Sequence, residues 1–345
     1  MNDIPQTMTA LLQKGDGFSG SYEGPAISDA SVYLETANVP VPQPGDGQVL
    51  IRLRASSVNP SDLHFIKGEY GQPRIKGKPA GFEGCGDVVA TGKGAEGLMG
   101  LRVAFVAGGP EGSGAWADYA LTDAAMCIPL RPDVSDEDGS AQIVNPMTAM
   151  AMIDLADRAG DAVVISAATS QLGKLMIALA HDRGLKTIAL VRRAEAVAPL
   201  AALGADEVLV TTDSDVVKQF AVISKKLKPI VFLDAVSDQL SEQLFATMPV
   251  GARWVVYGKL VSDLPKLTQM GQLIFMSKQI EGFWLSRWMM TTRREQQAEV
   301  VGEVQARFAD GRWKTDIAAR LTLSQAVEAL PSALKMGDGK VIITP

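Results

Sequence analysis

The sequence contains few residues of the types that bind metals or form disulfides, with two cysteines and two histidines among 345 residues. Cys85 and Cys127 are too few for a disulfide framework or a four-cysteine zinc site. The formal charge is -6, and no basic run opposes it, which argues against a nucleic-acid or anionic-membrane partner. No stretch is apolar for long enough to span a bilayer, and residues 1–10 lack a signal-peptide core. We therefore expect a cytoplasmic protein.

The chain is long enough for two domains, and its character changes near Pro132. Glycines and short alternating runs before that point predict strands at 48–54, 86–92, 101–106 and 116–120. From Gly160 onward, apolar runs alternate with helical segments, which is typical of a parallel sheet covered by helices. Its strands are predicted at 162–165, 187–191, 208–210, 230–234, 254–257 and 280–285. Helices at 292–310 and 324–336 and a strand at 340–344 complete the prediction.

The segment 161–193 predicts a strand, a tight turn, a helix and a second strand. Residues 162–165 form the short β-branched run of a strand buried on both faces. Small residues follow up to Gly173, so the backbone can approach a pyrophosphate at the helix N-terminus. Ala168 and Ser170 replace the first two glycines of the usual Gly-x-Gly-x-x-Gly pattern. An ordinary strand–helix connection without a ligand is the alternative.

Arg192 and Arg193 follow the second strand of this segment, roughly 20 residues after the fingerprint, where NAD-specific folds place an acid. No acid occupies positions 191 to 194. Two guanidinium groups suit the 2′-phosphate of NADPH, so we expect NADPH to bind better than NADH. The alternative is that both arginines are merely solvated.

Several short motifs together resemble one enzyme superfamily. They are Ser57-Val-Asn-Pro-Ser-Asp62, Pro79-Ala-Gly-Phe-Glu-Gly-Cys-Gly86, Asn145-Pro-Met-Thr-Ala149, Leu203-Gly-Ala-Asp206 and Gly339-Lys-Val-Ile-Ile-Thr344. Their order and spacing resemble the medium-chain dehydrogenase/reductase superfamily over nearly the whole chain. The resemblance implies an α/β protein with a GroES-like, β-rich catalytic domain (1–132 and 287–345). A Rossmann domain with a doubly wound parallel sheet (133–286) is expected between these two segments.

The sequence departs from the zinc alcohol dehydrogenases of that superfamily. That branch has a cysteine where this chain has Asn59, a histidine where it has Phe82, and a second cysteine near Asn145. None of these side chains offers zinc a thiolate or an imidazole, so we expect no metal. Without a Lewis acid, reduction of an already polarised acceptor is favoured over oxidation of a simple alcohol.

A narrower resemblance is to the zinc-free 2-enoyl thioester reductases and quinone oxidoreductases. Asn59-Pro-Ser-Asp62, Gly68-Glu-Tyr-Gly71, Asn145-Pro-Met-Thr-Ala149 and Gly282-Phe-Trp-Leu285 are most similar to the enoyl thioester group. In that group the tyrosine that matches Tyr70 is the proposed proton donor. Its glycine-flanked loop is expected to be flexible enough to bring a phenol to the substrate. The two branches share much of this pattern, so both acceptors stay open.

The resemblance also implies which residues contact the cofactor. They are Asn59, Asn145, Thr148, Thr169, Ser170, Gln171, Leu172, Arg192, Arg193, Tyr257, Phe283, Trp284, Leu285 and Lys340. Asn59 and Asn145 each precede a proline and could instead only organise turns. The two histidines, His64 and His181, lie in no recognisable motif.

The sequence thus predicts an NADPH-dependent, zinc-independent reductase that adds hydride to the β-carbon of an α,β-unsaturated carbonyl, with Tyr70 as proton donor. A quinone is the alternative acceptor. A non-enzymatic nucleotide-binding protein is the alternative of another class. The substrate is expected to be a small molecule, and the superfamily's habit suggests a homodimer.

Overall fold

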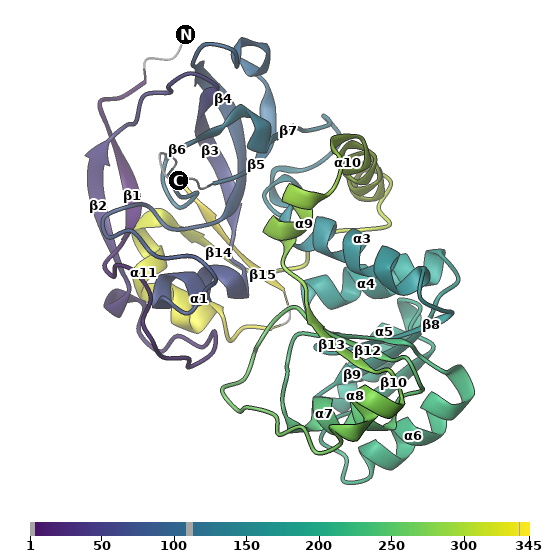
Figure 1. Cartoon of the computed structure of the whole chain (residues 1–345). Helices are drawn as coiled ribbons and strands as arrows, with labels where there is room; N and C mark the ends of the chain where they lie inside the picture. Colours follow the sequence, from purple (N-terminus) through teal and green to yellow (C-terminus); the bar gives the residue numbers. More distant parts are fainter. Residues whose placement is uncertain (1–3, 108–112, 338) are drawn as a thin grey trace. The chain divides into compact units, whose positions relative to one another are not determined.

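The computed structural model describes residues 4–107, 113–337 and 339–345, and the chain divides into two compact units (Figure 1). Unit 1 comprises Met1–Val144 and Val301–Pro345, and unit 2 comprises Asn145–Val300. The sequence placed these divisions earlier, at 132/133 and 286/287. The second division of the structure, between Val300 and Val301, falls inside the helix α10 (Arg294–Ala309).

Unit 1 is built on a sheet with the strand order β14-β15-β3-β4-β5-β7, in which β6 also pairs with β3. The C-terminal strand β15 lies between β14 and β3, so both ends of the chain contribute to one sheet (Figure 1). The strands of unit 1 are β1 (Thr7–Gln13), β2 (Leu34–Pro40), β3 (Gln48–Ser57), β4 (Glu83–Thr91), β5 (Arg102–Val106), β6 (Tyr119–Asp123), β7 (Cys127–Pro129), β14 (Ile317–Thr322) and β15 (Lys340–Thr344). Its helices are α1 (Pro60–Lys67), α2 (Asp136–Gly139) and α11 (Leu323–Ala333), with short 3-10 turns η1 (Ala30–Val32), η2 (Glu96–Leu98) and η3 (Ala124–Met126).

One strand of unit 1 begins later than the sequence predicted. The apolar run at 116–120 indicated a strand, but β6 starts at Tyr119, where pairing with β3 begins. Trp116 is fully buried, and its backbone bonds elsewhere: its N–H donates to Ala80 at 2.8 Å and its carbonyl accepts from Leu11 at 2.9 Å. The run is therefore apolar because it fills the core, not because all of it pairs in the sheet.

Unit 2 contains six parallel strands in the order β10-β9-β8-β11-β12-β13. This order, which reverses direction next to the first strand, is that of the doubly wound dinucleotide-binding fold. The expected fold class is therefore confirmed for this unit. The strands are β8 (Ala162–Ile165), β9 (Lys186–Val191), β10 (Glu207–Val210), β11 (Val231–Asp234), β12 (Arg253–Val256) and β13 (Gln279–Gly282). The helices are α3 (Val144–Asp157), α4 (Gln171–Asp182), α5 (Val197–Ala202) with η4 (Ala194–Ala196) before it, α6 (Val216–Leu227), α7 (Gln239–Thr247), α8 (Gly271–Phe275), α9 (Leu285–Thr291) and α10.

The last strand of unit 2 is shorter than the sequence predicted. The run 280–285 indicated a strand, but β13 ends at Gly282 and Trp284 caps α9. The Phe283 N–H still donates to the carbonyl of Val256 in β12, at 2.9 Å. The chain therefore leaves the sheet immediately after the strand, and residues 283–285 lie at its carboxyl end.

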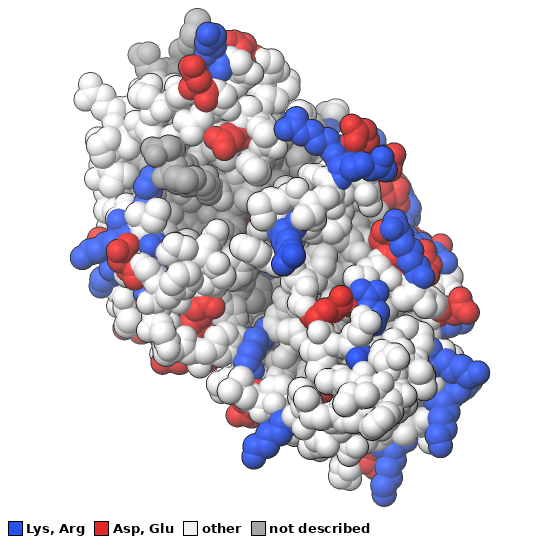
Figure 2. Space-filling view, in the orientation of Figure 1, with Lys and Arg blue, Asp and Glu red and all other residues white. Residues whose placement is uncertain are grey.

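Figure 2 shows basic and acidic side chains interspersed over the face it presents, on a chain of net charge -6. Within the described ranges, no helix is both long enough and apolar enough to cross a membrane.

Candidate active site

The turn at 59–62 begins α1 and fixes the first predicted site residue. Pro60 occupies the first helical position, where an N–H is not needed. The Asp62 carboxylate accepts a 2.7 Å hydrogen bond from the backbone N–H of Asn59. The buried Asn59 side chain donates at 2.9 Å to Glu83. Asn59 therefore both organises the turn and belongs to a buried polar network.

Lys340 joins this network from the other end of the chain. Its ammonium donates to Asn59 Oδ1, from 281 positions away, and lies 3.5 Å from the carbonyl oxygen of Val58. Burial lowers the pKa of Lys340, while Glu83 and Asp62 act in the opposite direction. Two of the predicted cofactor-binding residues, Asn59 and Lys340, are thus in direct contact.

Glu83 is the buried acceptor at the centre of the network. One carboxylate oxygen accepts from the Ser57 hydroxyl at 2.8 Å and the Asn59 amide at 2.9 Å. The other accepts from the backbone N–H groups of Ile143 at 3.2 Å and Val144 at 2.8 Å. Both oxygens have donors, so the burial of Glu83 leaves no acceptor unsatisfied. The sequence reasoning did not single out Glu83, although it lies in one of the quoted motifs.

Asp62 links the network to the aromatic residue at position 82. Its second oxygen accepts from the backbone N–H of Phe82 at 2.7 Å. Burial raises the pKa of Asp62 to about 7, with a further contribution from Glu83, and this outweighs the two backbone hydrogen bonds and Lys340. An aspartate three residues after the helix-capping position was a visible signal for this role.

Replacing Asp62 by asparagine should destabilise the protein more at about pH 5 than at about pH 8. The folded carboxyl binds its proton more tightly than an unfolded aspartate, whose pKa is about 3.9. The contribution of Asp62 to the free energy of unfolding is therefore complete below the unfolded pKa and declines as pH rises towards about 7. The contribution of an asparagine to the free energy of unfolding does not depend on pH. Asparagine also leaves one buried backbone N–H without its acceptor, which costs about 1–3 kcal/mol. Denaturant unfolding at both pH values measures this, and a cost that grows with pH would contradict it.

Tyr70 lies in a cluster of aromatic rings in unit 1. Its ring centroid is 5.1 Å from that of Phe82 and 6.4 Å from that of Phe65, and the rings of Phe65 and Phe82 are 4.9 Å apart. Since Asp62 fixes the backbone of Phe82, the surface on which the Tyr70 ring packs is itself fixed. The structure therefore brings the predicted catalytic tyrosine next to the Asn59 network.

The donor set around Phe82 does not fit zinc. Phe82 offers a ring without a lone pair, and Asn59 offers an amide that already bonds to Glu83 and Lys340. Within the part of the chain that the structure describes, no three His, Cys, Asp or Glu side chains are grouped so as to hold a metal ion.

The turn after β8 has the close backbone approach that a dinucleotide requires. Ser170 caps α4 by accepting a 3.0 Å hydrogen bond from the N–H of Gly173. A Cβ atom at Gly173 would lie 2.6 Å from the Ala168 carbonyl oxygen, so no other residue fits without a shift of the backbone. The helix begins at Gln171, directly after its serine cap. Thr169, Ser170, Gln171 and Leu172 therefore form the turn and the first residues of the helix.

Further predicted cofactor residues lie at the carboxyl ends of neighbouring strands. Arg192 and Arg193 follow β9 and are exposed, and Arg193 Nε lies 3.4 Å from Glu195. Tyr257 follows β12, and its hydroxyl is buried with no hydrogen-bond partner among the described residues. Burial raises the pKa of this phenol, so it keeps its proton and can donate. These positions form one edge of the sheet, where ligands of such folds bind.

The sequence reasoning missed Asp234, the last residue of β11, which organises this edge. Its carboxylate accepts from the Ser166 hydroxyl at 2.6 Å and the Trp254 indole at 2.8 Å. It also accepts from the N–H groups of Val236 at 2.9 Å and Ser237 at 3.1 Å. Asp234 therefore links its own strand, β11, to side chains from the neighbouring β8 turn and from β12. An acid ending an apolar strand was its only signal in the sequence.

Asn145 and Thr148 lie in the first turns of α3, and both are buried. The alternative for Asn145 was that it only organises a turn before a proline. Asn145 instead lies within a helix.

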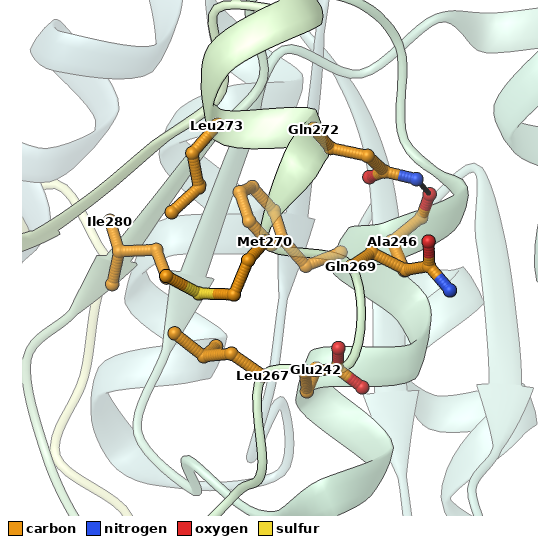
Figure 3. A pocket seen from close by; sticks show the side chains of 9 residues that line it. Glu242, Ala246, Leu267, Gln269, Met270, Gln272, Leu273 and Ile280 are labelled. Carbon is orange, nitrogen blue, oxygen red and sulfur yellow. Dashed lines mark hydrogen bonds between the residues drawn. The ribbon is translucent and has the colours of Figure 1, made fainter.

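A pocket elsewhere in unit 2 contains none of the predicted site residues. It lies beside β13 and α8, and its walls are mainly apolar (Figure 3). Leu267, Met270, Leu273 and Ile280 supply much of the lining, and Gln272 donates to the carbonyl of Ala246 at 3.1 Å.

Family models match both units. The model described as "Alcohol dehydrogenase GroES-like domain" matches residues 45–132, and the one described as "Zinc-binding dehydrogenase" matches residues 172–303. The first match confirms the expected GroES-like domain in unit 1. The second description names zinc, whereas the expected ligand positions in this chain hold Asn59 and Phe82.

Individual relatives cover almost the whole chain. A mitochondrial enoyl-[acyl-carrier-protein] reductase of Caenorhabditis elegans is 30% identical over 92% of this chain and 92% of its own. The enzyme of the same name from Arabidopsis thaliana is 29% identical over 88% of this chain and 80% of its own. A crystal structure from Mesorhizobium loti, described as a candidate NADPH:quinone reductase, is 46% identical. It covers 99% of this chain and 100% of its own with a TM-score of 0.95.

Proposed function

This chain belongs to the medium-chain dehydrogenase/reductase superfamily and is an NAD(P)H-dependent reductase; we propose that its cofactor is NADPH and its acceptor an α,β-unsaturated carbonyl, an enoyl thioester in particular. The observation that carries the proposal is the Tyr70 phenol, packed on Phe82 beside the buried Asn59 network. The chain's relation to enoyl-[acyl-carrier-protein] reductases supports the same acceptor.

The residues at the edge of the unit 2 sheet fit the cofactor. The tight approach at Gly173 and the capped start of α4 suit a pyrophosphate. The Tyr257 hydroxyl, which has no hydrogen-bond partner among the described residues, can donate to a ligand. The cofactor, when bound, supplies the hydride. The protein itself must bind and orient the cofactor and the acceptor, and it must supply a proton to the acceptor.

Tyr70 is the proposed proton donor. Hydride arriving at the β-carbon leaves negative charge on the carbonyl oxygen, and the α-carbon must then receive a proton. A phenol carries its proton at neutral pH and can donate it. Phe65 and Phe82, which also contact each other, both pack against the ring that carries this hydroxyl.

Quinone reduction is the second candidate, supported by the 46% identical Mesorhizobium loti protein. The test is loss of absorbance of reduced nicotinamide with enoyl thioesters, simple enones and quinones at matched concentrations. We expect the highest kcat/KM with an enoyl thioester. A higher value with quinones would favour the second candidate, and NADPH binding without turnover on any acceptor would reject both.

For the assembly we propose a homodimer formed through the edge of unit 2. β13 is the last strand of its sheet, and the neighbouring α8 exposes Ile274 and Phe275, the latter to 85%. Exposed strand edges and apolar patches favour pairing with another chain. Ile280→Lys, in β13, should convert a dimer into a monomer by light scattering. Val222→Lys, at an exposed position of α6, should not. A wild-type monomer would contradict the proposal.

A further inference from the structure

Glu69, the residue before Tyr70, carries a buried carboxylate in unit 1. Its side chain is 1% exposed. One oxygen lies 3.2 Å from His64 Nδ1. The other lies 3.4 Å from the Lys67 ammonium and accepts a 2.8 Å hydrogen bond from the backbone N–H of Glu23. Both oxygens are therefore engaged, and burial makes such contacts stronger than they would be in water.

The groups that contact Glu69 are themselves fixed. The Lys67 ammonium donates to the carbonyl oxygen of Gly24 at 2.7 Å. The Tyr22 ring stacks on His64 with centroids 5.3 Å apart, and its hydroxyl lies 3.5 Å from His64 Nε2. Burial, together with Glu69, raises the pKa of Tyr22, so this phenol stays neutral. We call Tyr22, His64, Lys67 and Glu69 the Glu69 cluster.

The same N-terminal segment also holds the backbone of the loop. The carbonyl of Gly68 accepts from the N–H of Ser19 at 2.9 Å. Gly68 has φ +78°, and a Cβ atom there would lie 2.6 Å from the Arg74 guanidinium and 2.7 Å from the Ser19 nitrogen. The glycines predicted a flexible loop, but Gly68 serves a left-handed turn and a close approach. The loop that carries Tyr70 is anchored.

We propose that Glu69 is a positioning residue for Tyr70: its bonds to His64 and Lys67 fix the backbone from which the phenol projects. This inference rests on the proposed function, in which Tyr70 donates the proton. The Phe65 and Phe82 rings contact the Tyr70 ring, but they do not fix the backbone that carries it. The Glu69 carboxylate, through its directional bonds at the adjacent residue, does fix that backbone. Displacements of about 1 Å at a reacting group cost up to about 100-fold in rate.

The first test is Glu69→Gln, which keeps the shape and removes the charge. With an enoyl thioester we expect kcat to fall on the order of 10-fold, with the KM for NADPH unchanged. Glu23→Gln is the matched control, because its carboxylate reaches the same Lys67 at 3.5 Å but is 67% exposed. It should leave kcat within about twofold. Equal kcat values for the two variants would overturn the positioning role.

A double-mutant cycle separates this role from the proposed function. If Glu69 acts through Tyr70, Glu69→Gln should add no further loss in a Tyr70→Phe background. Full additivity would overturn the inference. If Tyr70→Phe alone loses nothing, the proposed role of Tyr70 fails, and the positioning role falls with it. A loss in Tyr70→Phe with normal turnover in Glu69→Gln would reject the positioning role alone.

A second pair of variants decides the matter if Glu69→Gln does not fold. His64→Phe removes the ring nitrogen that faces Glu69, whereas His64→Asn keeps an amide near the place of Nδ1. We expect kcat to fall in the phenylalanine variant and to recover in the asparagine variant, with the KM for NADPH constant in both. Equal kcat values in the two variants would overturn the proposal.

Discussion

Tyr70→Phe is expected to lower the turnover of an enoyl thioester on the order of 100-fold, with NADPH affinity unchanged. Phenylalanine keeps the ring that packs at 5.1 Å on Phe82 and 6.4 Å on Phe65, so the local structure should survive. Only the hydroxyl, and with it the proton, is removed. Steady-state kinetics with varied thioester and varied NADPH should show the loss in kcat, not in the KM for NADPH.

The same variant should lose less activity with a quinone. The product of quinone reduction is stabilised by its aromatic ring, and water can supply the proton, so a positioned phenol matters less. Tyr33→Phe is a matched control, because this half-buried tyrosine of unit 1 packs against the core. It should change neither rate. If Tyr70→Phe loses no activity with either acceptor, Tyr70 is a packing residue and the catalytic assignment is wrong.

The fold was predictable because its signals are local. Each short apolar run between 162 and 256 became a parallel strand with bounds within a residue or two of the expected ones. The errors occurred where an apolar run serves packing or a cap instead of pairing, as at Trp116 and Trp284. A period of two cannot distinguish a buried loop residue from a strand residue.

The polar contacts of the candidate site were not predictable because they join distant parts of the chain. The Asn59 motif and the C-terminal lysine were both visible, but nothing local indicates that Lys340 donates to Asn59. Glu83 likewise accepts hydrogen bonds from the backbone N–H groups of Ile143 and Val144, which are distant in the sequence. The spacing of these residues in the sequence does not indicate such contacts, because they form only in the folded protein.

The Glu69 cluster shows the same limit more sharply. His64 lies in no motif and would be dismissed as an isolated histidine from the sequence. Its neighbour Glu69 follows a glycine that predicts a mobile loop. Only the N-terminal segment, which supplies Tyr22 and the Gly24 carbonyl, makes this charged group a fixed one. The energetics of a buried charge depend on all of its partners, so they cannot be read from a short window.

Replacing Arg192 and Arg193 together by alanine is the second large effect that we expect. The KM for NADPH should rise on the order of 100-fold and that for NADH by less than about threefold. Both arginines follow β9 at the carboxyl edge of the unit 2 sheet, and both are exposed. A guanidinium binds a phosphate through paired, charge-assisted hydrogen bonds, whereas ribose hydroxyls in NAD-specific folds require an acid.

The single variants should divide this effect unequally. Arg193 Nε lies 3.4 Å from the Glu195 carboxylate, so part of its charge is already compensated. Arg192→Ala should therefore raise the KM for NADPH more than Arg193→Ala does. Arg158→Ala is the control, because this arginine of unit 2 is exposed and pairs with Asp154 at 2.8 Å, well away in sequence from β9. Like each of the single variants, it removes one positive charge, and it should leave the KM values for NADPH and NADH unchanged. Equal increases in the KM values for NADPH and NADH in the double variant would show that the two arginines do not recognise the 2′-phosphate. Any preference for NADPH would then depend on other residues.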